Sequence, residues 1–184
     1  MNNSLNLMQA RLSARVGQFQ QDKMIKDKKE TLDRVVKYSY QGAKVQELGS
    51  DTIAYALINP NKVKQDYDDK IISIGYEYNY TPGTIFDWVN TGTKWLIYLQ
   101  DLTELAYFKG DIRKCNYEIR WKNKDNKLCS TFVALTGPKE TNLNSSVKEG
   151  ISLDVPNNTL YFMVPNNPDT AEYFTRYQEF YLNN

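Results

Sequence analysis

Apolar and polar side chains alternate along the C-terminal two thirds of the chain. In the stretch AYFKGDIRKCNYEIRW (residues 106–121) nearly every second side chain is apolar. This period of two residues is typical of a strand that buries one face. Phe108 and Ile112 share one parity, whereas Trp121 has the other. We expect a one-residue β-bulge at 113–114 to cause the change, because bulges bend the strands of small barrels.

Further segments with apolar alternation, separated by turn residues, predict more strands. The turns TPG at 81–83 and NTGT at 90–93 contain the Gly, Pro and Asn residues that tight turns favour. In the first segment we expect Tyr76, Tyr78 and Tyr80 to share one face of a strand. This face belongs either to the core or to a protein interface, because a tyrosine has an apolar body and a polar tip. The predicted strands are IISIGYEYNY, TIFDWV, KWLIYLQDL, LCSTFVAL, SLDV, TLYFMV and RYQEFYL.

Two of these segments support more specific predictions. The segment Trp95 to Leu99 is apolar throughout, which is typical of a strand covered on both faces. The strand that starts at Leu128 forms a hairpin with the one that ends at Trp121. We expect Leu128 to lie opposite Trp121, because this register places one apolar face on both strands.

Residues 4–40 follow a helical pattern. Apolar residues recur at steps of three and four, and the second half of the segment is strongly charged. So narrow an apolar stripe needs another surface to lie on, either the protein's own barrel or a neighbouring subunit. The candidate partner-interface residues are Leu5, Met8, Leu12, Val16 and Phe19.

The order of these elements predicts a mainly β fold with an N-terminal helical arm. Many short strands separated by turns are typical of a small antiparallel barrel, either SH3-like or OB-like. We expect the arm to cover residues 1–48 and the β-barrel domain to cover residues 49–184.

The composition offers few groups for catalysis. Of 184 residues none is histidine and only two are cysteine, so the common general base and the usual zinc sites are missing. The glycine-containing turns lack the spacing of a phosphate-binding loop. We therefore expect no enzyme, no cofactor, no metal and no small-molecule substrate. No apolar run reaches the length of a membrane span, so we expect no membrane partner.

Nucleic-acid binding stays open as an alternative. The formal net charge of +1 gives no long-range attraction to polyanions. Basic and aromatic residues are nevertheless mixed in 112–124, as they are on platforms that bind single strands. On this reading an OB- or SH3-like module binds nucleic acid through Lys114, Arg120, Trp121 and Lys122.

One long segment resembles a known family. Residues 84–121 combine a strand containing Trp88, a polar turn, the run WLIYLQ, the run YFKGDIRKC and a second alternating strand that ends at Trp121. This combination is similar to small neck or head-closure proteins from the structural gene clusters of tailed bacteriophages. The resemblance covers roughly residues 70–184.

The resemblance implies a structural protein of the portal vertex, made in the host cytoplasm and built into the virion neck between capsid and tail. Such proteins form rings of many copies, and these rings join head to tail and help to retain packaged DNA. The implied partners are copies of itself, the portal, adjacent neck or tail proteins, and DNA passing through the ring. A capsid or tail accessory protein is a further alternative within the same class.

Overall fold

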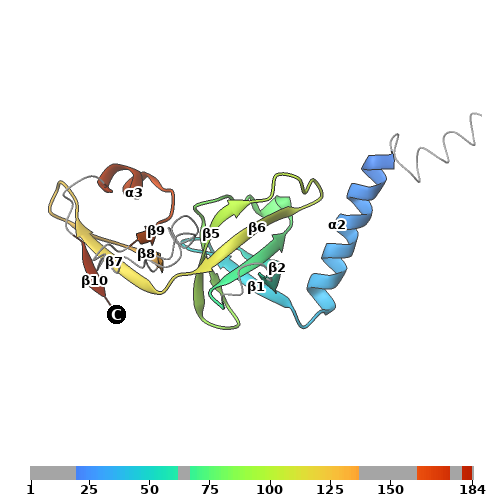
Figure 1. Ribbon diagram of the computed structural model, residues 1–184, viewed down its shortest axis with the longest axis horizontal. Coiled ribbons are helices and arrows are strands. Elements are labelled where there is room, and N and C mark those ends of the chain that lie inside the picture. The colour runs from blue at the N-terminus through green and yellow to red at the C-terminus, as the bar shows by residue number, and fades with distance from the viewer. Residues whose placement is uncertain (1–19, 62–66, 137–160, 175–179, 184) are drawn as a thin grey trace, which may run out of the picture.

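The computed structural model describes residues 20–61, 67–136, 161–174 and 180–183 (Figure 1). Helix α2, a β-barrel and a second, smaller sheet lie in a row along the long axis of the molecule. The elements are α2 (Gln20–Tyr38), β1 (Gly42–Glu47), β2 (Ile53–Pro60), β3 (Asp69–Ile74), the 3₁₀ helix η1 (Tyr76–Tyr78), β4 (Ile85–Trp88), β5 (Thr93–Gln100), β6 (Phe108–Lys114), β7 (Tyr117–Lys122), β8 (Leu128–Thr136), β9 (Tyr161–Met163), α3 (Pro168–Tyr173) and β10 (Tyr181–Asn183).

Six strands close into an antiparallel barrel in the order β1-β2-β3-β6-β5-β4. Closure leaves no exposed sheet edge in this part of the molecule. The predicted mainly β fold, a small antiparallel barrel preceded by a helix, is confirmed. The barrel begins at Gly42, so its first strand lies within the segment expected to belong to the arm.

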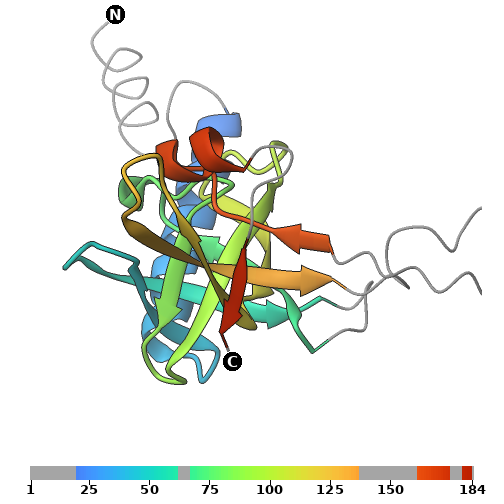
Figure 2. The same cartoon turned by 90° about the vertical axis from the view of Figure 1, so that its left-hand side faces the viewer.

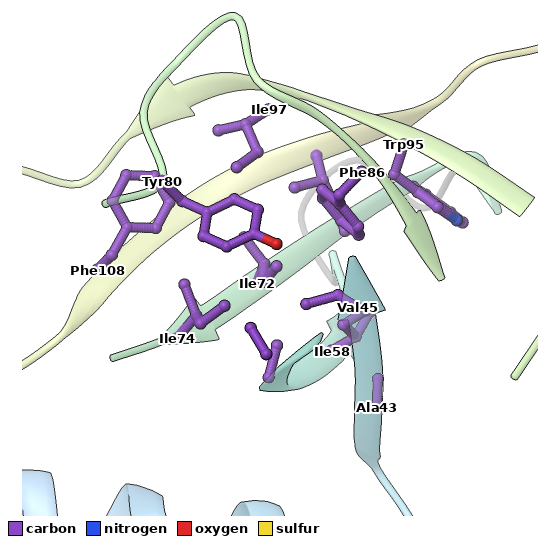
Figure 3. Packing of buried hydrophobic residues seen from close by; sticks show 13 residues of the cluster. Ala43, Val45, Ile58, Ile72, Ile74, Tyr80, Phe86, Trp95, Ile97 and Phe108 are labelled. Atoms are coloured by element: carbon purple, nitrogen blue, oxygen red, sulfur yellow. The ribbon is translucent and has the colours of Figure 1, made fainter. Parts of the chain in front are cut away.

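Alternate residues of the six strands fill the barrel interior (Figure 3). Tyr80 enters from the loop before β4 and meets Phe86 edge to face, with ring centroids 6.0 Å apart. Each such buried aliphatic or aromatic side chain contributes about 1.5–3 kcal/mol through the removal of apolar surface from water. The interior residues are Ala43, Val45, Ala54, Ala56, Ile58, Ile72, Ile74, Tyr80, Phe86, Trp95, Ile97, Phe108 and Ile112.

Helix α2 rests on β1 and β2 through its C-terminal half. Leu32 and Val36, one turn apart, are its buried residues. Gly42 starts β1 directly below the end of the helix, where an added Cβ would lie 2.1 Å from the Val36 carbonyl oxygen. The chain therefore turns from helix to barrel at a point where only glycine fits.

The second sheet has the order β10-β7-β8-β9 and carries α3. Its small core is centred on Ile119, Trp121 and Val133. Helix α3 is capped by Asn167, whose side chain accepts from the Thr170 amide while Thr170 bonds back to the Asn167 amide. This reciprocal arrangement satisfies backbone donors that would otherwise lack partners.

The second sheet covers part of the outer surface of the barrel. Trp95 and Ile97 point into the barrel, so Leu96 points outward, yet it is only 1% exposed. Strand β8 contacts β5 on this side. The prediction of a strand covered on both faces is thus confirmed for Trp95 to Ile97. It is wrong for Leu99, because the register shifts between Ile97 and Leu99 and leaves Leu99 55% exposed.

The long alternating stretch 106–121 is two strands, not one bulged strand. Strand β6 belongs to the barrel and β7 to the second sheet, separated by Cys115 and Asn116. The apolar parity changes because each strand faces a different core. The strands of the segment expected to form one barrel domain therefore divide between two sheets.

Two other local predictions are wrong. Trp121 lies opposite Cys129, not Leu128, since the β7–β8 hairpin encloses an odd loop, Lys124 to Asn126, between Asn123 and Lys127. Asn126 has the positive φ of 60° that this loop type requires.

The expected strand through Tyr80 ends at Ile74. Tyr76 to Tyr78 form a single 3₁₀ turn, which Asn79 terminates with a φ of 55°. Tyr76 is exposed and Tyr80 is buried, so the tyrosines do not share a face.

Candidate interaction surfaces

The structure places part of the helical arm on the protein's own barrel. Lys28 Nζ lies 3.0 Å from Glu104 Oε2, and Lys29 Nζ lies 3.6 Å from Glu77 Oε2. These ion pairs and the buried Leu32 fix one side of α2, while its other side is exposed to solvent. The candidate interface residues Leu5, Met8, Leu12, Val16 and Phe19 lie outside the described residues.

The loop between β5 and β6 (residues 101–107) is held by several side-chain hydrogen bonds. The Asp101 carboxylate accepts from the Thr103 amide and hydroxyl and from Lys109 Nζ. The Tyr76 hydroxyl donates to the Glu104 carbonyl over 2.7 Å, and the Glu104 carboxylate accepts from Lys28 and the Ala106 amide.

The electrostatics of this loop favour the ionised carboxylates. The Thr103 hydroxyl and the Lys109 ammonium lower the pKa of Asp101 to about 2. Burial opposes ionisation of Glu104, but hydrogen bonds from Lys28 and the Ala106 amide outweigh it and hold the pKa of Glu104 below its ordinary value.

The same loop displays apolar side chains to solvent. Leu102 is 78% exposed and Leu105 is 56% exposed, and Leu99 lies on the strand that leads into the loop. An ordered loop that presents leucines has already lost the conformational entropy that a partner would otherwise have to remove. We name Leu99, Leu102 and Leu105 the leucine loop.

The hydrogen bonds of Asp101 are expected to stabilise the protein in a pH-dependent manner. Because the pKa of Asp101 is lowered from 3.8 to about 2 in the folded protein, the stabilisation by its hydrogen bonds is complete above pH 4 and is lost as the pH falls towards 2. Thr103→Ala removes the largest contribution and should raise the pKa of Asp101 towards 3.8. Carbon-detected NMR titration of the carboxyl groups measures this. An unchanged midpoint in the variant would contradict the network.

The four nucleic-acid candidates do not form one platform. Trp121 is 1% exposed and packs against Phe174 and Phe180, so the prediction that it offers a stacking surface is wrong. Arg120 and Lys122 lie on the opposite face of β7, and the Arg120 guanidinium is 2.8 Å from Glu118 Oε2. The residues are neighbours in sequence, but the strand divides them between core and solvent.

Lys114 lines a shallow groove at the joint between the barrel and the second sheet, together with Lys94 and Phe132. The Lys94 ammonium lies 2.8 Å from Asp87 Oδ1 and 4.7 Å from the centroid of the Phe132 ring. The Asp87 carboxylate already compensates the charge of Lys94, and the Lys94 ammonium already occupies the face of the Phe132 ring. This arrangement gives the groove little attraction for a polyanion.

Two side chains with reactive groups, Cys115 and Asp69, are held by packing and by an ion pair. Burial raises the pKa of the Cys115 thiol to about 12, so the thiol is protonated and a poor nucleophile at neutral pH. The buried Asp69 carboxylate pairs with Arg113, Nη1 to Oδ2 3.4 Å. In the described residues no three acidic or cysteine side chains are grouped to hold a metal ion, and neither helix has the length and apolarity of a membrane span.

The fold and surfaces thus define a class: a mainly β protein with a small closed barrel, a helix fixed on it and an ordered apolar loop. Comparison with known proteins adds nothing to this class, since no family model, no curated protein and no solved structure matches the chain.

Proposed function

We propose that the protein is a structural component of a tailed-phage virion. It forms a ring at the portal vertex, in the neck between capsid and tail, where it joins head to tail and helps to retain packaged DNA. Its partners are copies of itself, the portal, and adjacent neck or tail proteins. The resemblance of residues 84–121 to neck and head-closure proteins supports this assignment.

The leucine loop is the observation that carries the proposal. Solvent-exposed leucines on a flexible loop are common, but Leu102 and Leu105 stand on a loop held by the Asp101, Glu104 and Tyr76 hydrogen bonds. Apolar side chains presented on an ordered backbone are typical of sites that bind another protein. The Lys28–Glu104 ion pair joins α2 to this loop, so the helix and the loop lie next to each other and can contact one partner together.

The arrangement along the long axis supports a place between two other components. Helix α2 and the leucine loop occupy the barrel end of the molecule, whereas the second sheet occupies the other end (Figure 1). A connector needs different surfaces for its two neighbours, and this molecule separates them by the length of the barrel. We assign the α2 and leucine-loop end to the portal.

Co-sedimentation with purified portal rings of the encoding phage tests the assignment. We expect the wild-type protein to bind and the double variant Leu102→Ser/Leu105→Ser to bind about 10–100-fold more weakly, as the loss of two central apolar contacts predicts. Val89→Ser, which removes an exposed apolar side chain from the β4–β5 turn, should bind like the wild type.

Two results would contradict the proposal in different ways. Equal binding by the double variant would remove the leucine loop from the interface. A wild-type protein that ignores the portal, and that cryo-electron microscopy of the virion locates on the capsid shell or at the tail tip, would reassign the protein to an accessory role.

A further inference from the structure

Two hairpin tips of opposite charge project from the molecule. The first is the β1–β2 tip, residues 47–53, which extends sideways from the barrel (Figure 2). It contains Glu47 and Asp51 and no basic residue, so its formal charge is −2. Leu48 and Ile53 flank these acids and are 45% and 48% exposed. We call residues 47–53 the acidic tip.

The second is the β7–β8 tip, residues 122–128, at the far end of the second sheet (Figure 1). Three lysines and one aspartate give it a formal charge of +2. Lys124 pairs with Glu172, whereas Lys122 and Lys127 form no ion pair with another described residue. Leu128 is 57% exposed beside Lys122, its register partner. We call residues 122–128 the basic tip.

Both tips are ordered by their own hydrogen bonds. In the acidic tip the Ser50 amide donates to the Glu47 carbonyl, and the Gln46 side chain donates to the Ser50 carbonyl over 2.7 Å. In the basic tip the Asn123 side chain accepts from the amides of Asp125 and Lys127. Neither tip has to be ordered on binding, which lowers the entropic cost of association.

Within one molecule the charges of the acidic tip are not paired with those of the basic tip. Glu47 and Asp51 form no ion pair with any described residue, and the two tips belong to different sheets and point in different directions (Figures 1 and 2). Each is therefore open to a second molecule. Opposite charge combined with exposed apolar side chains on both sides is the complementarity that steers and aligns protein interfaces.

We propose that the acidic tip of one copy docks on the basic tip of the next copy. The contact is head-to-tail, since it joins two different patches of the same chain, and repetition of such a contact generates a closed ring or an open filament. The inference rests on the proposed function and deepens it, because it names the surfaces that would join neighbours in the ring.

Charge reversal tests the contact by analytical ultracentrifugation of the purified full chain at micromolar concentrations and low salt. Glu47→Lys/Asp51→Lys makes both tips basic, and Lys122→Glu/Lys127→Glu makes both tips acidic. We expect the wild type to self-associate and each variant alone to associate at least about tenfold more weakly. An equimolar mixture of the two variants should associate again, because every contact in the mixture can then join opposite charges.

A matched control reverses two exposed lysines of α2, Lys23→Glu/Lys37→Glu, and should associate like the wild type. Circular dichroism verifies that every variant is folded. Self-association that survives either reversal would overturn the proposal, as would two monomeric variants whose mixture stays monomeric. A wild-type chain that is monomeric at all concentrations yet binds portal rings would overturn this inference alone and leave the proposed function standing.

Discussion

Trp121→Ala is expected to unfold the second sheet while the barrel stays folded. Trp121 is among the largest fully buried side chains, and its ring centroid lies 5.6 Å from that of Phe174 and 6.4 Å from that of Phe180. Removal of so large a buried side chain costs about 3–5 kcal/mol. The other fully buried residues of the second core are mainly Ile119 and Val133. The packing that remains is therefore too small to keep the second sheet folded.

Hydrogen exchange measured by NMR resolves the two sheets separately. We expect amides of β7 and β8 to lose protection in the variant, while amides of β3 and β6 keep theirs. Trp121→Phe is the matched control. Trp121 Nε1 is buried with no hydrogen-bond partner among the described residues, so phenylalanine removes an unsatisfied donor and leaves a smaller cavity than alanine. Uniform loss of protection in both sheets would show that barrel and sheet unfold as one unit.

Arg113→Met is expected to destabilise the barrel by about 3–5 kcal/mol, because it leaves a buried carboxylate without its cation. Asp69 is 3% exposed and Arg113 is 8% exposed. The Tyr98 hydroxyl lies 3.2 Å from Asp69 Oδ1 and 3.3 Å from Asp111 Oδ2. Burial and these two carboxylates raise the pKa of Tyr98, so it remains a protonated donor, but one proton cannot replace a guanidinium.

Urea denaturation followed by fluorescence measures the change in the free energy of unfolding. The double variant Asp69→Asn/Arg113→Met should recover most of the loss, since it removes both buried charges together. Arg120→Met breaks the more exposed pair with Glu118 and should cost under about 1 kcal/mol. A similar loss for Arg113→Met and Arg120→Met would mean that burial does not set the cost of breaking the pair.

Local patterns predicted most of the strands after residue 68 but not β1, and they predicted the assembly of the strands poorly. The alternation around Phe108 and around Trp121 predicts extended backbone in both places, but it was interpreted as one bulged strand and not as β6 and β7. A change of apolar parity, however, has the same appearance whether a bulge or a change of sheet produces it. Which one occurs depends on contacts with β5 and β8, distant in sequence, and these contacts are not encoded in the spacing of apolar residues.

The candidate functional residues were harder to predict than the fold. Lys114, Arg120, Trp121 and Lys122 have the composition of a nucleic-acid platform, but composition does not tell which side of a strand each residue occupies. The leucine loop was missed because Leu102 was included in the predicted strand KWLIYLQDL, and the apolar side chains of a predicted strand are expected in the core. The one available signal was the pair Asp101 and Thr103, since an Asp that accepts from a residue two positions on is typical of an ordered turn.

The passage of one chain segment from β6 into β7 has a mechanical consequence. Only Cys115 and Asn116 separate the strands, and their amides donate to the Lys94 and Val133 carbonyls, one on each sheet. Force applied along the molecule therefore passes through a short backbone segment that is hydrogen-bonded to both sheets, so the joint cannot extend unless these hydrogen bonds break. A rotation of the second sheet would therefore be transmitted to the barrel. We expect the connection between them to be stiff and not to act as a hinge.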